Sequence, residues 1–356
     1  MQSTYNVLIM GASYGSLLAT KLLLAGHTAK LICLPTEADL INDEGTRGRM
    51  PVLGRDGLVE IDSRKLPGKL SAGGPADADP SEFDLVALAM QEPQYRSNGV
   101  RELLASVARS GVPCMSIMNM PPLPYLERIP GVSADACRSC YTDASVWDDF
   151  DPDMMTLCSP DAQAFRPPED KVNVLQVSLP TNFKAARFES DSETYILRRL
   201  ESDIEAARLE TTDGDVEIPV KLRVHDSVFV PLAKWAMLLA GNYRCVRNDD
   251  VRSIRDAVHS DPDGARSVYE WVNALCMSLG ADDKDLVPFD KYANAARSLQ
   301  RPSSAARALA AGATHIERTD RLVQSIAAQK GTRNDHVDAT VAAIDGWLER
   351  NRKKAA

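Results

Sequence analysis

The sequence lacks the features of several protein classes. Its 41 Lys and Arg against 50 Asp and Glu give a formal net charge of −9, so we expect no nucleic-acid partner, which would favour a basic surface. No apolar run reaches the length of a membrane span. The N-terminus also lacks the basic segment of a signal peptide. We therefore expect a cytoplasmic protein with no contact to a membrane.

A metal-binding pattern is absent as well. The seven cysteines are odd in number and scattered, which is typical of reduced thiols in the cytoplasm. Cys137 and Cys140 form a lone C-x-x-C, with no second pair and no histidine at zinc spacing. We expect these two residues to be structural and the protein to hold no metal.

The chain does contain a strand–turn–helix–strand pattern near its N-terminus. An apolar run over 7–10 leads into Gly11, and a helical pattern over 16–25 is followed by a second apolar run over 31–34. Such a unit presents backbone N–H groups and the positive end of a helix to a pyrophosphate. We therefore predict that a nicotinamide dinucleotide binds at the turn. The predicted contacts are Gly11, Ala12, Ser13, Tyr14, Gly15 and Ser16.

This turn departs from the usual G-x-G-x-x-G fingerprint, because it is one residue shorter and Ser13 stands at the second glycine. Two alternatives follow. The glycines can serve only the geometry of a strand–helix turn. The pattern Gly11-x-Ser13-x-Gly15 also fits the nucleophile elbow of hydrolases, for which His225 or His315 would be the base.

The end of the second strand indicates which cofactor binds. Leu34 offers no carboxylate for the ribose hydroxyls of NAD, and Thr36 can only form a hydrogen bond. Glu37 lies further beyond the end of the strand than the usual acidic residue. Arg47 and Arg49 follow and are predicted to meet a 2′-phosphate, unless they form a solvated basic loop. The pattern favours NADP, with NAD as the alternative.

Two near-continuous apolar runs, 83–90 and 112–118, predict strands buried on both faces of a parallel sheet. Asn119 follows the second run, at the sheet edge where ligands bind in this architecture. We predict that it contacts cofactor and substrate, with a turn-forming role as the alternative.

From about residue 225 the pattern is mostly helical. We therefore expect an α/β protein in which an N-terminal Rossmann-type doubly wound sheet (1–190) is followed by an all-helical C-terminal domain (191–356) for substrate binding and dimerisation. The helices predicted after 225 span 227–243, 249–260, 265–279, 290–298, 303–329 and 335–350.

Two helical segments carry polar residues that suggest chemistry. In the first, Lys234 and Asn242 share one helix face among apolar residues, and a buried lysine is costly without a partner or a role. The second begins at Ser303 and includes His315. Taken singly, these residues also fit a snorkelling lysine, a helix N-cap and an ordinary helix histidine.

Together with the N-terminal unit, these segments resemble the ketopantoate reductase (2-dehydropantoate 2-reductase) family over most of the chain. In that family a catalytic lysine is followed eight residues later by a substrate-binding asparagine, the spacing of Lys234 and Asn242. A serine and a glutamate twelve residues apart face the substrate, the interval of Ser303 and His315. His315 therefore stands at the position of the family's glutamate, and Leu238 stands at the position of the family's second asparagine.

The resemblance also matches Asn119 to an asparagine after the fourth strand, whereas the cofactor-side lysine is absent at Ala89 or Met90. It implies a C-terminal domain similar to that of 6-phosphogluconate dehydrogenase, a homodimer, and NAD(P)H-dependent reduction of a 2-oxo acid. The departures at His315 and Leu238 leave open whether that acid is ketopantoate. Lys234 would be the proton donor. His315 would be the second catalytic candidate, and Asn119, Asn242 and Ser303 would bind substrate.

Two other functions stay open from the sequence. An opine-type dehydrogenase joins an amine to a 2-oxo acid and would use His315 or His225 as its acid and base. A non-catalytic sensor would bind the dinucleotide without turnover.

Overall fold

The structure is a computed structural model that describes residues 4–212 and 214–355. By its internal contacts the chain divides into two compact units. The first, the sheet unit, comprises the chain up to Met90 together with Gln94–Met118 and Val146–Asp226. The second, the helical unit, comprises Gln91–Pro93, Asn119–Ser145 and the chain from Ser227 onward.

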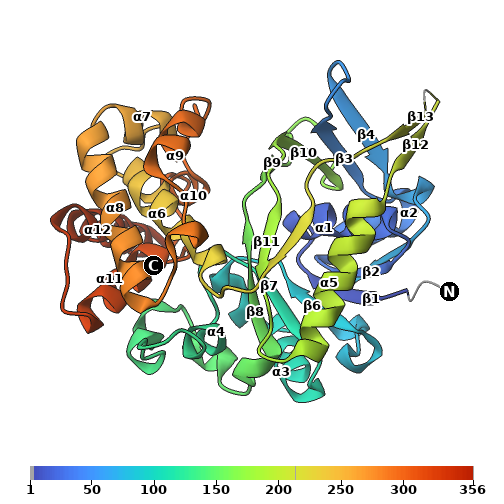
Figure 1. Cartoon of the computed structure of the whole chain (residues 1–356), viewed down its shortest axis with the longest axis horizontal. Helices are drawn as coiled ribbons and strands as arrows, with labels where there is room; N and C mark the ends of the chain where they lie inside the picture. The colour runs from blue at the N-terminus through green and yellow to red at the C-terminus, as the bar shows by residue number, and fades with distance from the viewer. Residues whose placement is uncertain (1–3, 213, 356) are drawn as a thin grey trace. The chain divides into compact units, whose positions relative to one another are not determined.

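An eight-stranded, mostly parallel sheet forms the sheet unit, with strand order β14-β11-β8-β7-β6-β1-β2-β5 (Figure 1). Only the β8–β11 pair is antiparallel. Its strands are β1 (Asn6–Met10), β2 (Thr28–Ile32), β5 (Lys69–Gly73), β6 (Leu85–Leu88), β7 (Cys114–Ile117), β8 (Met155–Pro160), β11 (Phe183–Ala186) and β14 (Leu222–His225). The chain order reverses between β1 and β6, which makes that pair the topological switch point of a doubly wound sheet.

Burial explains why the central strands are so apolar. Val7–Met10 and all of β6 are fully buried, because parallel strands are covered on both faces. The helices of this unit are α1 (Tyr14–Leu24), α2 (Pro35–Glu44), α3 (Val100–Ser110) and α5 (Asp191–Ala206).

A second sheet of this unit was not predicted. Its strand order is β4-β3-β10-β9, and β10 pairs in parallel with β3. The strands are β3 (Arg47–Pro51), β4 (Leu58–Asp62), β9 (Gln163–Phe165) and β10 (Val174–Leu179), and a separate hairpin joins β12 (Leu209–Thr211) to β13 (Gly214–Val216).

Helices build the helical unit. They are α4 (Leu123–Glu127), α6 (Lys234–Met237), α7 (Ile254–His259), α8 (Pro262–Leu279), α9 (Phe289–Ala296), α10 (Ser304–Ala310), α11 (Thr319–Gln329) and α12 (Asp335–Ala355). The expected fold class, a Rossmann-type sheet followed by a helical region, is confirmed. None of the described helices is long and apolar enough to cross a membrane.

The compact units do not follow the expected boundary at residue 190. Helix α5 and strand β14 belong to the sheet unit, because β14 pairs with β11 along its whole length. Asn119–Ser145 belongs to the helical unit although it precedes β8 in the chain. The roles assigned to the two domains stay predictions.

Candidate active site

The glycine turn lies at the switch point of the sheet. Gly11 follows β1 with φ +107°, and a Cβ there would lie 2.8 Å from the Ala89 carbonyl oxygen and 2.7 Å from Met90 Cγ. Both the left-handed backbone and this close approach to the end of β6 therefore require glycine. A Cβ at Gly15 would lie 2.7 Å from Ile9 Cγ2, so this glycine lets α1 pack closely on β1.

The start of α1 suits an anion. Its N-cap, Ser13, makes no side-chain capping bond within the described structure, and the first turn of α1 carries no acidic residue. Ala12 and Ser16 are buried beside it, and the Ser16 hydroxyl donates to the Ser13 carbonyl at 2.8 Å. Backbone N–H groups at the positive end of an 11-residue helix thus fit a pyrophosphate.

The arginines predicted to bind a 2′-phosphate are engaged elsewhere. Arg47 Nη1 lies 2.5 Å from Asp62, and Arg49 contacts Glu60 and Asp170 at 2.7 Å each. These ion pairs occupy both arginines, so they no longer support the choice of NADP. The other observation behind that prediction, the lack of a carboxylate at Leu34, is unchanged. Thr36 is exposed in the first turn of α2, at the end of β2.

In the hydrolase alternative, His225 would lie too far from Ser13 to act as its base. His225 ends β14, which is separated from β1 by five strand spacings, about 24 Å. That separation is far beyond the hydrogen bond that a Ser13–His225 pair would need.

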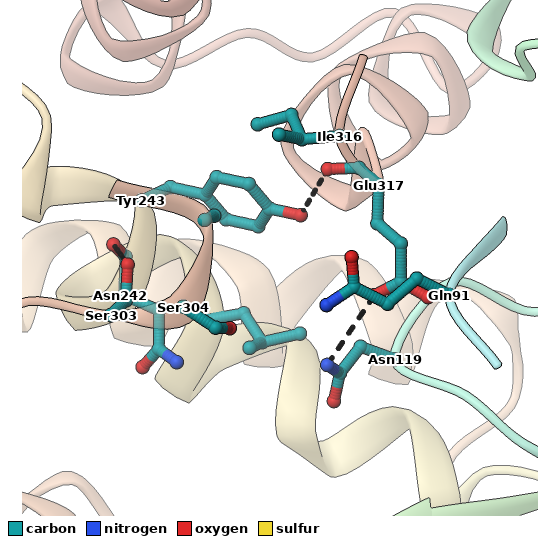
Figure 2. A pocket seen from close by; sticks show the side chains of 10 residues that line it. Gln91, Asn119, Asn242, Tyr243, Ser303, Ser304, Ile316 and Glu317 are labelled. Atoms are coloured by element: carbon teal, nitrogen blue, oxygen red, sulfur yellow. Dashed lines mark hydrogen bonds between the residues drawn. The ribbon is translucent and has the colours of Figure 1, made fainter. Parts of the chain in front are cut away.

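The helical unit contains a small polar pocket (Figure 2). Its volume of about 20 Å³ holds roughly one water molecule, so the pocket as it stands is too small for an organic substrate. The lining residues are Gln91, Asn119, Leu238, Asn242, Tyr243, Ser303, Ser304, Ala305, Ile316 and Glu317.

Asn119 and Glu317 face each other in this pocket (Figure 2). The Asn119 amide nitrogen lies 3.5 Å from Glu317 Oε2, and the backbone N–H of Glu92 donates to Glu317 Oε1 at 3.3 Å. The Asn119 Oδ1 atom is buried and has no hydrogen-bond partner among the described residues. A buried acceptor without a partner is unfavourable, so this atom is a candidate contact for a ligand's N–H or O–H.

Glu317 is the titratable group of the pocket. Burial raises its pKa to about 7, and the neighbouring carboxylate of Glu92 acts in the same direction. The hydrogen bonds from Glu92 N–H and Asn119, and the positive charge of Lys234, act against that rise. A carboxyl group whose pKa is raised toward neutrality suits acid–base chemistry.

Glu92 is itself held rigidly. It is 2% exposed, and its carboxylate accepts hydrogen bonds from the Thr142 backbone N–H at 2.9 Å and the Thr142 hydroxyl at 2.8 Å. The carboxylate that shifts the Glu317 pKa thus occupies a fixed position.

The helix that carries Lys234 and Asn242 is irregular. Four residues of α helix starting at Lys234 continue as a π-helical turn, Leu238–Asn242. The Tyr292 hydroxyl donates to the Met237 carbonyl at 3.1 Å, and a Cβ at Gly241 would lie 1.9 Å from that hydroxyl. The predicted regular helix over 227–243 is thus wrong in detail, and π-helical turns are frequent at functional sites.

Ser303 has the helix-capping role that was the alternative to substrate binding. Its hydroxyl donates to the Asn242 carbonyl at 2.6 Å and accepts from the Ala306 N–H at 3.2 Å. The Tyr243 hydroxyl donates to the Glu317 carbonyl at 2.7 Å and accepts from the Thr319 N–H at 3.1 Å. These bonds fix the backbone around the pocket.

Glu317 was missed as a site residue because the family's twelve-residue interval, counted from Ser303, ends at His315. Both residues were placed in one helix predicted over 303–329. The helix breaks instead at Gly312 (φ +95°), and an irregular stretch leads to α11. His315 lies in that stretch, half buried, with its Nδ1 3.0 Å from the Thr314 hydroxyl, and is not among the lining residues. The signal that could have found Glu317 is Gly312, a common helix terminator.

No group of three or more His, Cys, Asp or Glu able to hold a metal ion occurs in the described part of the chain. Cys137 and Cys140 are free thiols, buried in a 3₁₀ turn.

No family model and no curated protein matches the sequence. Solved structures do match over almost the whole chain. A candidate ketopantoate reductase from Ralstonia solanacearum MolK2 is 14% identical with a TM-score of 0.68, covering 98% of this chain and 99% of its own. A ternary complex of D-mandelate dehydrogenase with NADH and anilino(oxo)acetate is 12% identical with a TM-score of 0.64, covering 98% and 99%.

A dimeric ketopantoate reductase from Staphylococcus aureus is 10% identical with a TM-score of 0.60, covering 97% and 99%. At such low identity these matches concern the fold. The chain has the fold of the solved ketopantoate reductases.

Proposed function

We propose that the protein is an NAD(P)H-dependent reductase that converts a 2-oxo acid into a 2-hydroxy acid. The observation that carries this proposal is the pocket in which Glu317, with a pKa of about 7, accepts from the Asn119 amide nitrogen and lies within electrostatic reach of Lys234. The unpartnered Asn119 Oδ1 lies in the same pocket. The shared fold with ketopantoate reductases and with an NADH-bound mandelate dehydrogenase supports the reaction class.

Five polar residues have roles in the proposal. Four of them line the pocket, and Lys234 is not among its lining residues. The cofactor supplies the hydride, and the Lys234 ammonium protonates the alkoxide that develops on the substrate carbonyl oxygen. Glu317 carries the proton that returns Lys234 to its ammonium form. Asn119 and Asn242 orient the substrate, whereas Ser303 has one remaining lone pair and chiefly orients Asn242.

The dinucleotide is proposed to bind at the glycine turn of the sheet unit. The close approach at Gly11, the packing of Gly15 and the uncapped N-terminus of α1 support this placement. The predicted contacts of Thr36 and Asn119 with the cofactor remain part of the proposal. So does the choice of NADP over NAD.

A homodimer is proposed because a ketopantoate reductase of the same fold is described as dimeric. The cytoplasm is the proposed location, which the free state of all seven cysteines supports, each within the described residues.

The test is an absorbance assay with NADPH and NADH against a panel of 2-oxo acids, each with and without amines. We expect cofactor oxidation with a 2-oxo acid alone. Turnover only when an amine is added would indicate an opine-type dehydrogenase. Cofactor binding without turnover on the whole panel would indicate a sensor.

A further inference from the structure

The chain after β8 crosses the sheet edge where the dinucleotide is proposed to bind. This segment, Asp161–Arg166, is held at its start by an ion pair of 2.9 Å between Asp161 and Lys184 of β11. Next to it, the Tyr14 hydroxyl at the start of α1 donates to the Ala162 carbonyl at 2.8 Å. The segment then forms β9, which pairs with β10 of the second sheet (Figure 1). It therefore passes directly beside the glycine turn.

Arg166, at the end of this segment, reaches the other half of the proposed cofactor site. Its guanidinium forms an ion pair with Glu37, in the first turn of α2 just after β2. Cys33, the residue after β2, is close enough for both charges to act on it. Burial raises its pKa to about 12, Glu37 adds to the rise and Arg166 opposes it. Arg166 thus stands at the carboxyl end of β2, where the adenosine ribose of a dinucleotide lies in doubly wound sheets.

The two partners differ in exposure. The Arg166 side chain is 31% exposed and that of Glu37 is 11% exposed. A guanidinium has five N–H donors in a planar fork, so one carboxylate leaves donors for a second anion on the exposed side. Arg47 and Arg49 have more of their donors occupied. Arg49 is paired with two carboxylates, Glu60 and Asp170, and Arg47 is paired with Asp62 and donates to two backbone carbonyls.

We infer that Arg166 is the residue that recognises the 2′-phosphate of NADP, with Glu37 holding the guanidinium in place. This inference rests on the proposed dinucleotide site, and it replaces the role predicted for Arg47 and Arg49. The ligand it concerns is a phosphate monoester on an adenosine ribose, and NADPH is the form expected to bind more tightly.

Calorimetric titration with NADPH and NADH tests the inference. Arg166→Gln is expected to weaken NADPH binding about 10- to 100-fold, the loss of one charged hydrogen-bonded contact, and to change NADH binding by less than about threefold. Arg49→Gln is the matched control and should alter neither affinity. Glu37→Gln, which removes the ion pair that holds the guanidinium in place, should weaken NADPH binding, but by less than Arg166→Gln does.

The fragments adenosine 2′,5′-bisphosphate and 5′-AMP give the same comparison without the nicotinamide. Arg166→Lys keeps the charge without the fork and should fall between wild type and Arg166→Gln. It also serves as the test if the melting temperature shows that Arg166→Gln is unfolded.

Unchanged NADPH affinity in Arg166→Gln, or equal losses for NADPH and NADH, would overturn the inference. A wild type that prefers NADH would overturn it while leaving the proposed reductase intact. Wild-type protein that binds neither cofactor would refute the proposed function, and the inference with it.

Discussion

The glycine turn of the sheet unit and the polar pocket of the helical unit are built in opposite ways. The turn comes from six consecutive residues, Gly11 to Ser16, whose geometry is set by two neighbouring strands. The pocket brings together residues from separate stretches around 91, 119, 242, 303 and 317. A binding site made by one local segment can be recognised in a sequence, whereas a site assembled from several loops depends on where each helix ends.

The largest effect is expected at the local site. Gly11→Val places a branched side chain against Ala89 O and Met90 Cγ at a φ of +107°, so cofactor binding should become undetectable by calorimetry. Gly26→Ala is the matched control, because Gly26 also has a positive φ (+85°) but open space around it. If Gly11→Val bound the cofactor as well as Gly26→Ala does, the turn would not be the dinucleotide site.

In the assembled site the largest effect is expected from Lys234. Lys234→Ala should lower turnover by about 10²- to 10⁴-fold, the usual contribution of general acid catalysis, while cofactor affinity stays near normal. Lys234→Arg should not restore activity, because a guanidinium does not release its proton near neutral pH. Full turnover per folded molecule, with folding followed by the melting temperature, would instead make Lys234 a structural residue.

Sequence patterns sufficed for the fold wherever a single segment determines the structure. The buried strands β1, β6 and β7 and helix α1 were predicted from their apolar patterns. Strand β5 lies in a Gly- and Pro-rich stretch and was not predicted. Strand β3 was missed because its partner β10 lies far along the chain.

The polar pocket was predicted only in part, because it is assembled from separate segments of the chain. The structure brings Asn119, Asn242 and Ser303 to one pocket, but it places Glu317 there instead of His315. The helix break at Gly312 lies between Ser303 and the pocket residue. A count of residues along a regular helix from Ser303 therefore misses Glu317, which lies two residues after His315. Arg166 was missed because its contact with Glu37 joins segments that are distant in the chain.

Glu317 should make stability depend on pH in the acidic range. Its pKa is raised from 4.5 to about 7 in the folded state, so the folded protein binds a proton that the unfolded chain releases. This contribution is complete below pH 4.5 and is lost as pH rises to about 7, a change of roughly 3 kcal/mol in the free energy of unfolding. Urea unfolding of wild type and Glu317→Gln across this range should show the loss only in the wild type.

Lys21 of α1 should make stability depend on pH in a higher range. It is 1% exposed, its ammonium donates to the Ile218 and Pro219 carbonyls at 3.0 Å each, and burial lowers its pKa from 10.5 to about 7. The unfolded chain binds this proton more readily, so stability should rise with pH between about 7 and 10.5.

Lys21→Met should remove that dependence. At pH 7 it should also stabilise the protein by roughly 1 to 3 kcal/mol, since two carbonyls lose a partner but no ammonium is buried. A destabilised Lys21→Met at pH 7 would show that the two hydrogen bonds outweigh the desolvation of the ammonium.

The central claim is that Glu317, and not His315, is the titrating group beside Lys234. The most direct measurement is the pH dependence of kcat/KM for 2-oxo acid reduction in wild type, Glu317→Gln and His315→Ala. The account predicts a titration near pH 7 in the wild type and in His315→Ala, and its absence in Glu317→Gln. A titration that survives in Glu317→Gln and disappears in His315→Ala would contradict it.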